Sequence, residues 1–168
     1  MITETYNVEA LLAQRLEFSD QKSKRGSRRN LARFLVIFPV FMEAAKDKKV
    51  FTDEELEQFE YCDYLKTRLH PKHRNPITRW GRRHVFSIMR DGVSLYHDIK
   101  DYGLKNPLEL YTTLEGRRRM SRGGRRLVII SMLGHKTVPV RIFESRTAML
   151  NSGLDYSWKT GIIEDKEV

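Results

Sequence analysis

Residues 118–134 read Arg-Arg-Met-Ser-Arg-Gly-Gly-Arg-Arg-Leu-Val-Ile-Ile-Ser-Met-Leu-Gly, and they decide the fold that we expect for the second half of the chain. Residues 118–121 are expected to form a short strand that runs into the pair Gly123-Gly124. The apolar run 127–133 is too long and dense for a turn, and it closes on Gly134, as helices often do. The stretch therefore predicts a strand, a glycine turn and a helix in direct succession.

This succession has the chemistry of a phosphate site. The free amides at a helix N-terminus point outwards and carry about half a positive charge. Paired glycines let an anion approach the backbone without a Cβ in the way, and arginines add planar donors suited to phosphate. We therefore expect an anion site that consists of Arg122, Gly123, Gly124, Arg125 and Arg126. A tight turn with solvated arginines is the simpler alternative.

Regular turn signals on both sides extend the pattern to a small α+β domain. Gly103 is expected to end one helix, and Pro139 suggests that the last strand is an edge strand or irregular. In chain order we expect a strand over 85–89, a helix over 94–102, strands over 108–112 and 118–121, a helix over 127–133 and a strand over 137–143.

The first half of the chain is expected to be mainly helical. Asn7 can cap a helix over residues 7–18. The apolar run 31–45 predicts a helix that breaks near Pro39.

A capping box marks the next helix start, because Thr52 and Glu55 can each bond the other's backbone amide. This helix is expected to run to about residue 68 and to lead into a basic, turn-rich connection over 71–83. We accordingly divide the chain into a helical N-terminal segment over 1–80 that packs on the core, the core itself over 81–145, and a short C-terminal extension over 146–168.

Three motifs of the second half resemble the family of ParB N-terminal domains and sulfiredoxins. Residues 98–108 (Asp-Ile-Lys-Asp-Tyr-Gly-Leu-Lys-Asn-Pro-Leu) are similar to the ParB run of Ser-Ile, Gly-Leu and Pro. Residues 122–127 stand where the family has its Gly-Glu-Arg-Arg box, and residues 133–140 resemble its Leu-Gly and Val-Pro-Val motif. The match covers about residues 85–145 and implies a ParB/sulfiredoxin-like fold, a small mixed sheet with packed helices.

In this family the box of glycine and arginine binds nucleotide phosphates at a helix N-terminus. ParB proteins bind CTP there, sulfiredoxins bind ATP, and a related branch transfers phosphate. The resemblance therefore implies that Gly123, Arg125 and Arg126 hold a nucleoside triphosphate, and it leaves the participation of Mg²⁺ open.

Two departures limit what the resemblance carries over. Gly124 stands where ParB has glutamate and where sulfiredoxins have their catalytic cysteine, and Cys62 lies far outside the match, so we expect no sulfiredoxin chemistry. ParB has a helix-turn-helix domain after this core, whereas only about two dozen residues follow it here. We therefore expect no function in plasmid partition.

The positive charge of the chain adds nucleic acid to the expected partners. The formal net charge is +9, and basic residues gather in 22–29 and 117–126. Clustered positive charge favours binding of polyanions. The simpler alternative for the charge is that it keeps the protein soluble. The simpler alternative for Trp80 is that its partly buried ring anchors the loop. The residues expected to contact DNA or RNA have cationic or aromatic side chains and are Arg79, Trp80, Arg82, Arg83, Arg117, Arg118 and Arg119.

Composition also predicts the surroundings of the protein. Cys62 is the one cysteine, which fits a reducing cytoplasm. No window of 18 apolar residues and no secretory signal occurs, so we expect no membrane partner. A homodimer stays open.

Three functions compete at this point. The leading hypothesis is a nucleotide-binding ParB-like protein that acts on or beside nucleic acid. A phosphotransferase or nucleotide hydrolase would need carboxylates; Glu144 and Asp98 are weak candidates for them, and no acidic pair has a catalytic spacing. The third is a basic protein that binds the DNA or RNA backbone without a nucleotide. No metal site is expected, because His70 and His73 lack a clear third ligand.

Overall fold

The computed structural model describes residues 2–19, 27–68, 79–152, 154–156 and 163–165. In chain order these residues form β1 (Ile2–Asn7), α1 (Val8–Ser19), α2 (Ser27–Ala45), α3 (Asp53–Glu57), α4 (Glu60–Arg68), α5 (Arg79–Tyr102), β2 (Leu108–Thr112), β3 (Arg118–Arg122), α6 (Gly124–Met132), β4 (Thr137–Phe143), α7 (Arg146–Leu150), β5 (Leu154–Tyr156) and β6 (Ile163–Asp165). The fold is therefore of the expected α+β class.

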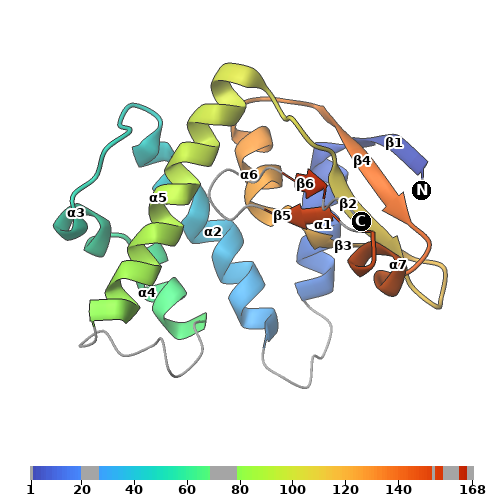
Figure 1. Cartoon of the computed structure of the whole chain (residues 1–168), viewed down its shortest axis with the longest axis horizontal. Coiled ribbons are helices and arrows are strands. Elements are labelled where there is room, and N and C mark those ends of the chain that lie inside the picture. The colour runs from blue at the N-terminus through green and yellow to red at the C-terminus, as the bar shows by residue number, and fades with distance from the viewer. Residues whose placement is uncertain (1, 20–26, 69–78, 153, 157–162, 166–168) are drawn as a thin grey trace.

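Four of the strands form one mixed sheet in the order β1-β4-β2-β3. β1 and β3 are antiparallel to their neighbours, whereas β2 and β4 are parallel, with Leu108 beside Val140. Figure 1 shows the sheet on one side of the molecule and α2 to α5 on the other, and α6 contacts both α2 and α5. The apolar side chains of β2, β4 and α6 thus face the helices in one continuous core.

Aromatic side chains between α2 and α4 hold the helical half together. Phe38 and Phe41 are fully buried, and their ring centroids lie 5.1 Å and 5.4 Å from that of Tyr61. Each such burial stabilises the fold by about 1.5–3 kcal/mol. α5 packs against the same cluster at Gly92, where an added Cβ would lie 3.7 Å from atoms of Phe38 and Met42.

The expected strand over 85–89 is wrong, because these residues belong to α5. The buried side chains of α5 recur every three or four residues, which is the period of a helix, and include Val85, Met89, Val93, Tyr96 and Ile99. The pair Asp91-Gly92 resembles a turn in the sequence, but Gly92 serves the close packing of α5 on α2. Residues 79–83 also lie in α5 instead of a connection.

Two expected helix boundaries differ as well. α2 continues through Pro39, although proline removes one helical N–H donor and crowds the preceding turn. Burial of Phe38 and Phe41 on either side offsets that cost. The capping box forms as expected, but the helix that it starts ends at Glu57, and α4 begins separately at Glu60. Residues 20–26 and 69–78, including the expected basic loop, lie outside the described residues.

The sequence reading missed β1, and this strand corrects the place of Pro139. β1 pairs with β4 from Ile2 beside Ile142 to Asn7 beside Thr137, so β4 is an inner strand and not the expected edge strand. On the other side of β4, the pairing with β2 begins only at Val140, so the missing N–H of Pro139 leaves no hydrogen bond of that pairing unmade. The N-terminal segment therefore contributes a strand to the main sheet in addition to its helices.

Candidate functional site

The connection from β3 to α6 has a backbone that favours glycine. Gly123 is the N-cap residue of α6 with φ 102°, and as a glycine it has no side chain to cap the helix. Side chains rarely tolerate this φ, and a Cβ would lie 3.0 Å from Cδ2 of Leu108 and 3.3 Å from Nη2 of Arg126. The expected strand, glycine pair and helix are confirmed, with the helix starting at Gly124, three residues earlier than expected.

Arg15 of α1 lies over the second glycine, and the sequence reading did not find it. A Cβ on Gly124 would come within 2.9 Å of Nη2 and 3.3 Å of Cζ of Arg15. The half-buried guanidinium therefore occupies the space that a side chain at position 124 would need. More than a hundred residues separate the two positions, so no local motif could reveal the contact.

The arginines of the expected phosphate site have unlike surroundings. Arg126 is only 3% exposed, and its Nη1 donates to the carbonyls of Asn106 at 3.0 Å and Pro107 at 3.2 Å. It thus ties the loop before β2 to the glycine pair from inside the protein. Arg125 is half-buried in the first turn of α6. The backbone of Arg122 pairs with Glu109, and its side chain lies outside the described part.

Positive charge accumulates at the start of α6. Its first turn contains no acidic residue, Arg125 lies within it, and Arg15 reaches it from α1. The helix dipole places about half a positive charge at the same end. Backbone amides and guanidinium groups are the donors that bind phosphate, and the segment is therefore chemically suited to a phosphate group.

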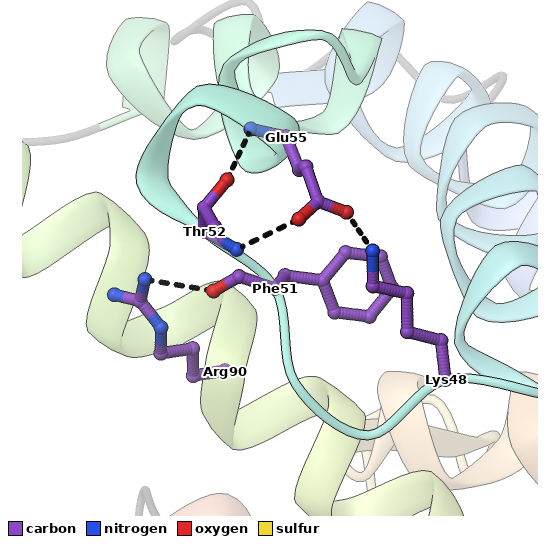
Figure 2. Close-up of polar contacts among 5 residues, drawn as sticks. All are labelled: Lys48, Phe51, Thr52, Glu55 and Arg90. Atoms are coloured by element: carbon purple, nitrogen blue, oxygen red, sulfur yellow. Dashed lines mark hydrogen bonds and ion pairs between the residues drawn. The ribbon is translucent and has the colours of Figure 1, made fainter.

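The start of α3 shows the opposite arrangement (Figure 2). The Thr52 hydroxyl accepts from the Glu55 amide at 3.2 Å, and the Glu55 carboxylate accepts from the Thr52 amide at 3.3 Å. Lys48 pairs with the same carboxylate, and Arg90 of α5 donates to the carbonyl of Phe51 at 3.1 Å. This helix start is satisfied by the protein's own side chains and has no need of an external anion.

A buried carboxyl lies in the strand beside the glycine pair. Glu109 of β2 is 1% exposed, and its Oε1 has no hydrogen-bond partner among the described residues. Its backbone neighbours are Arg122 on β3 and Arg141 on β4, and the residue before it contacts the place of a Cβ on Gly123. A buried polar atom that lacks a partner is costly. Side chains alternate along a strand, so Glu109 points to the face of the sheet opposite that of Leu108, which lies against Gly123. Glu109 is therefore a buried carboxyl one strand from the glycine pair but on the other face of the sheet.

The two carboxyls that the sequence suggested as catalytic are placed less well. Glu144 is exposed and follows the end of β4. The glycine pair lies at the other end of the strands, because Gly123 contacts Leu108 and Leu108 pairs with Val140 of β4. From Val140 to Glu144 the chain advances four residues, which is about 13 Å along a strand. Asp98 lies in α5, and no hydrogen bond of the described residues connects it to the glycine pair. Neither is brought to the site.

The expected nucleic-acid contacts divide into three groups. Arg79, Trp80, Arg82 and Arg83 lie in the first turns of α5, and their side chains are outside the described part. The helix continues for 19 residues from Arg83 to Tyr102, about 28 Å, before the loop that Arg126 holds. These residues are therefore too far away to stack on a base whose phosphates lie at α6.

Arg118 is engaged within the protein. Its Nη1 donates to the Tyr6 hydroxyl at 2.6 Å and to Oε2 of Glu4 at 2.8 Å, so it joins β3 to β1 across the sheet. The hydrogen bond to Tyr6, followed by that to Glu4, raises the pKa of Arg118. Arg117 and Arg119 are exposed on the same hairpin.

Comparison with protein-family models, with curated proteins and with solved structures finds no match to this chain. Among the described residues, no three His, Cys, Asp or Glu side chains gather as metal ligands. The same residues contain no helix with the length and apolar character needed to cross a membrane.

Proposed function

We propose that the protein binds the phosphates of a nucleoside triphosphate at the start of α6, on a ParB-like core, and acts on or beside nucleic acid. The observation that carries the proposal is the cationic helix start with glycine at its N-cap, where Arg15 and Arg125 meet a glycine pair. The resemblance of residues 98–108, 122–127 and 133–140 to ParB domains supports the same ligand class.

Each residue has a distinct role in this proposal. The first amides of α6, from Gly124 onwards, are the backbone donors that the helix start offers to the phosphates. Arg125 and Arg15 supply charged donors from two sides, and the base lies towards the loop 103–107. Arg126 acts from inside, because its bonds to Asn106 and Pro107 fix that loop beside the glycines.

A thermal-shift titration tests the proposal. A ligand at a hundred times its Kd raises the free energy of unfolding by about 2.7 kcal/mol. We expect one of ATP, CTP, GTP and UTP, with or without Mg²⁺, to stabilise the protein, and Arg125→Ala and Arg15→Ala to weaken that effect. Arg117→Ala removes the same charge from an exposed position away from α6 and is the matched control. Absence of stabilisation by all four nucleotides would contradict the proposal.

Nucleotide turnover is a second candidate function, and Glu109, the buried carboxyl one strand from the glycine pair, is the residue to test for it. A carboxylate that reaches the phosphates can act as a general base or bind Mg²⁺. Glu109→Gln keeps the shape of the side chain and removes its basicity. If Glu109 catalyses turnover, the wild type releases phosphate from the nucleotide, and Glu109→Gln still binds the nucleotide but releases no phosphate.

Backbone binding of DNA or RNA without a nucleotide is the third candidate, favoured by exposed Arg117 and Arg119 and by the net charge of +9. Neutralised phosphates release counterions, so affinity must fall steeply with salt. A fluorescence-anisotropy titration at several salt concentrations measures this slope. Binding that is indifferent to salt would exclude this candidate.

A further inference from the structure

The two edges of the main sheet are protected unequally. At β3, the side chain of Gln14 donates to the carbonyl of Arg118 at 2.6 Å, and the register with β2 shifts between Glu109 and Leu110. Natural sheets use such irregularities and covering groups to stop further strands from adding to an edge. β1 pairs with β4 over six residues without a shift and contains neither proline nor lysine. Among the described residues, no strand lies on its other side.

Pro139 indicates which backbone groups of β1 face outwards. Opposite residues of an antiparallel pair exchange two hydrogen bonds or none, in alternation. Thr5 lies opposite Pro139, which has no N–H and cannot take part in such an exchange. The amide and carbonyl of Thr5, and by alternation those of Thr3, therefore point away from β4 to the open edge.

The charge of β1 does not protect this edge either. Glu4 is the strand's one charged side chain, and Arg118 neutralises it through the ion pair of 2.8 Å. The exposed side chains Ile2, Thr3 and Thr5 are β-branched, which suits them to a strand pair. A second β1 is complementary to this edge, because two neutralised Glu4 side chains can lie opposite each other without the usual like-charge penalty.

We propose that β1 pairs antiparallel with β1 of a second copy of this chain, so that two main sheets join into one across a twofold axis. Thr3 then exchanges hydrogen bonds with Thr5 of the partner subunit, and Glu4 lies opposite Glu4 of the partner subunit. The twofold axis makes the contact self-complementary and closed, as in most homodimers. This surface is distinct from the start of α6, and the inference stands independently of nucleotide binding.

Sedimentation equilibrium of the full chain tests the proposal, with Thr5→Pro and Thr5→Val as a matched pair. Proline at position 5 removes an amide that points away from β4, so the pairing of β1 with β4 keeps its hydrogen bonds. The intersubunit bonds of this amide are lost, and the dimer Kd rises by about ten- to a hundredfold. Valine leaves the Kd near that of the wild type. Two results would overturn the proposal. One is a wild-type protein that is still monomeric at 100 times the protein concentration of the thermal-shift titration. The other is a Thr5→Pro protein whose dimer Kd equals that of the wild type.

A second variant set keeps the test valid if Thr5→Pro fails to fold. Arg118→Ala exposes the charge of Glu4 to Glu4 of the partner subunit and raises the dimer Kd severalfold at neutral pH. Adding Glu4→Gln removes the repulsion and restores the Kd. A Kd that Arg118→Ala leaves unchanged, or that Glu4→Gln fails to restore, would contradict the proposed register.

Discussion

The starts of α3 and α6 solve the same physical problem in opposite ways. Both helices expose backbone amides and a positive dipole end. At α3, Thr52 and Glu55 accept from those amides, and Asp53, Glu54 and Glu55 place negative charge in the first turn. At α6, Gly123 has no side chain to offer, and the charges nearby are those of Arg15 and Arg125.

The difference separates a structural helix start from a candidate ligand site. A capping box stabilises the fold in the absence of any ligand. The start of α6 instead has no N-cap side chain and gathers arginines at the positive end of the helix dipole, so we expect an anion to stabilise it.

Arg126→Leu should destabilise the protein most, by about 3–5 kcal/mol. The change leaves the buried carbonyls of Asn106 and Pro107 without their donor, at about 1–3 kcal/mol each, and disturbs the packing around the side chain. Urea denaturation measures the loss. An effect below about 1 kcal/mol would show that Arg126 does not hold this loop.

Gly123→Ala should cost about 2–4 kcal/mol, because the alanine meets both an unfavourable φ and the side chain of Leu108. Gly134→Ala is the matched control. Gly134 has φ 82° but open space around it, so only the conformational part, about 1–2 kcal/mol, is expected. Equal losses in the two variants would refute the close contact at Gly123.

Thr52→Ala should cost about 1 kcal/mol by removing one side of the capping box. We expect nucleotide to stabilise this variant as much as it stabilises the wild type, because the start of α3 needs no external anion. Differential scanning fluorimetry with and without nucleotide gives both values. A Thr52→Ala protein that loses the nucleotide response would mean that the two helix starts are not independent.

Arg125→Ala should have the smallest effect on stability. In chloride it should change the free energy of unfolding by less than about 1 kcal/mol, the size of a helix-dipole interaction. Inorganic phosphate should stabilise the wild type, and it should stabilise the variant less, because one donor to the anion is missing. Denaturant midpoints in chloride and in phosphate measure the change; equal gains in the two proteins would contradict a role of Arg125 at the start of α6.

Sequence reasoning succeeded where the decisive interactions are local. The strands at 108–112 and 137–143 and the capping box of Thr52 are found as expected, and Asn7 caps α1 through the Ala10 amide at 3.0 Å. Apolar alternation, turn residues and caps act within a few residues, so they can be read directly from the chain.

It failed where distant packing decides. Val85 to Met89 would suit a strand alone, but the surface of α2 around Gly92 selects a helix. β1 is short and polar and becomes a strand because β4 offers an edge. Arg15 reaches the candidate site only through the packing of α1 beside α6, which no local pattern records.

The contrast between the two helix starts can be measured residue by residue through backbone amide chemical shifts in a titration with the nucleotide that stabilises the protein. The account predicts large shifts for the amides of Gly124, Arg125 and Arg126 and none for those of Asp53, Glu54 and Glu55. Saturable shifts at α3 equal to those at α6, or shifts that leave the α6 amides unmoved, would contradict it.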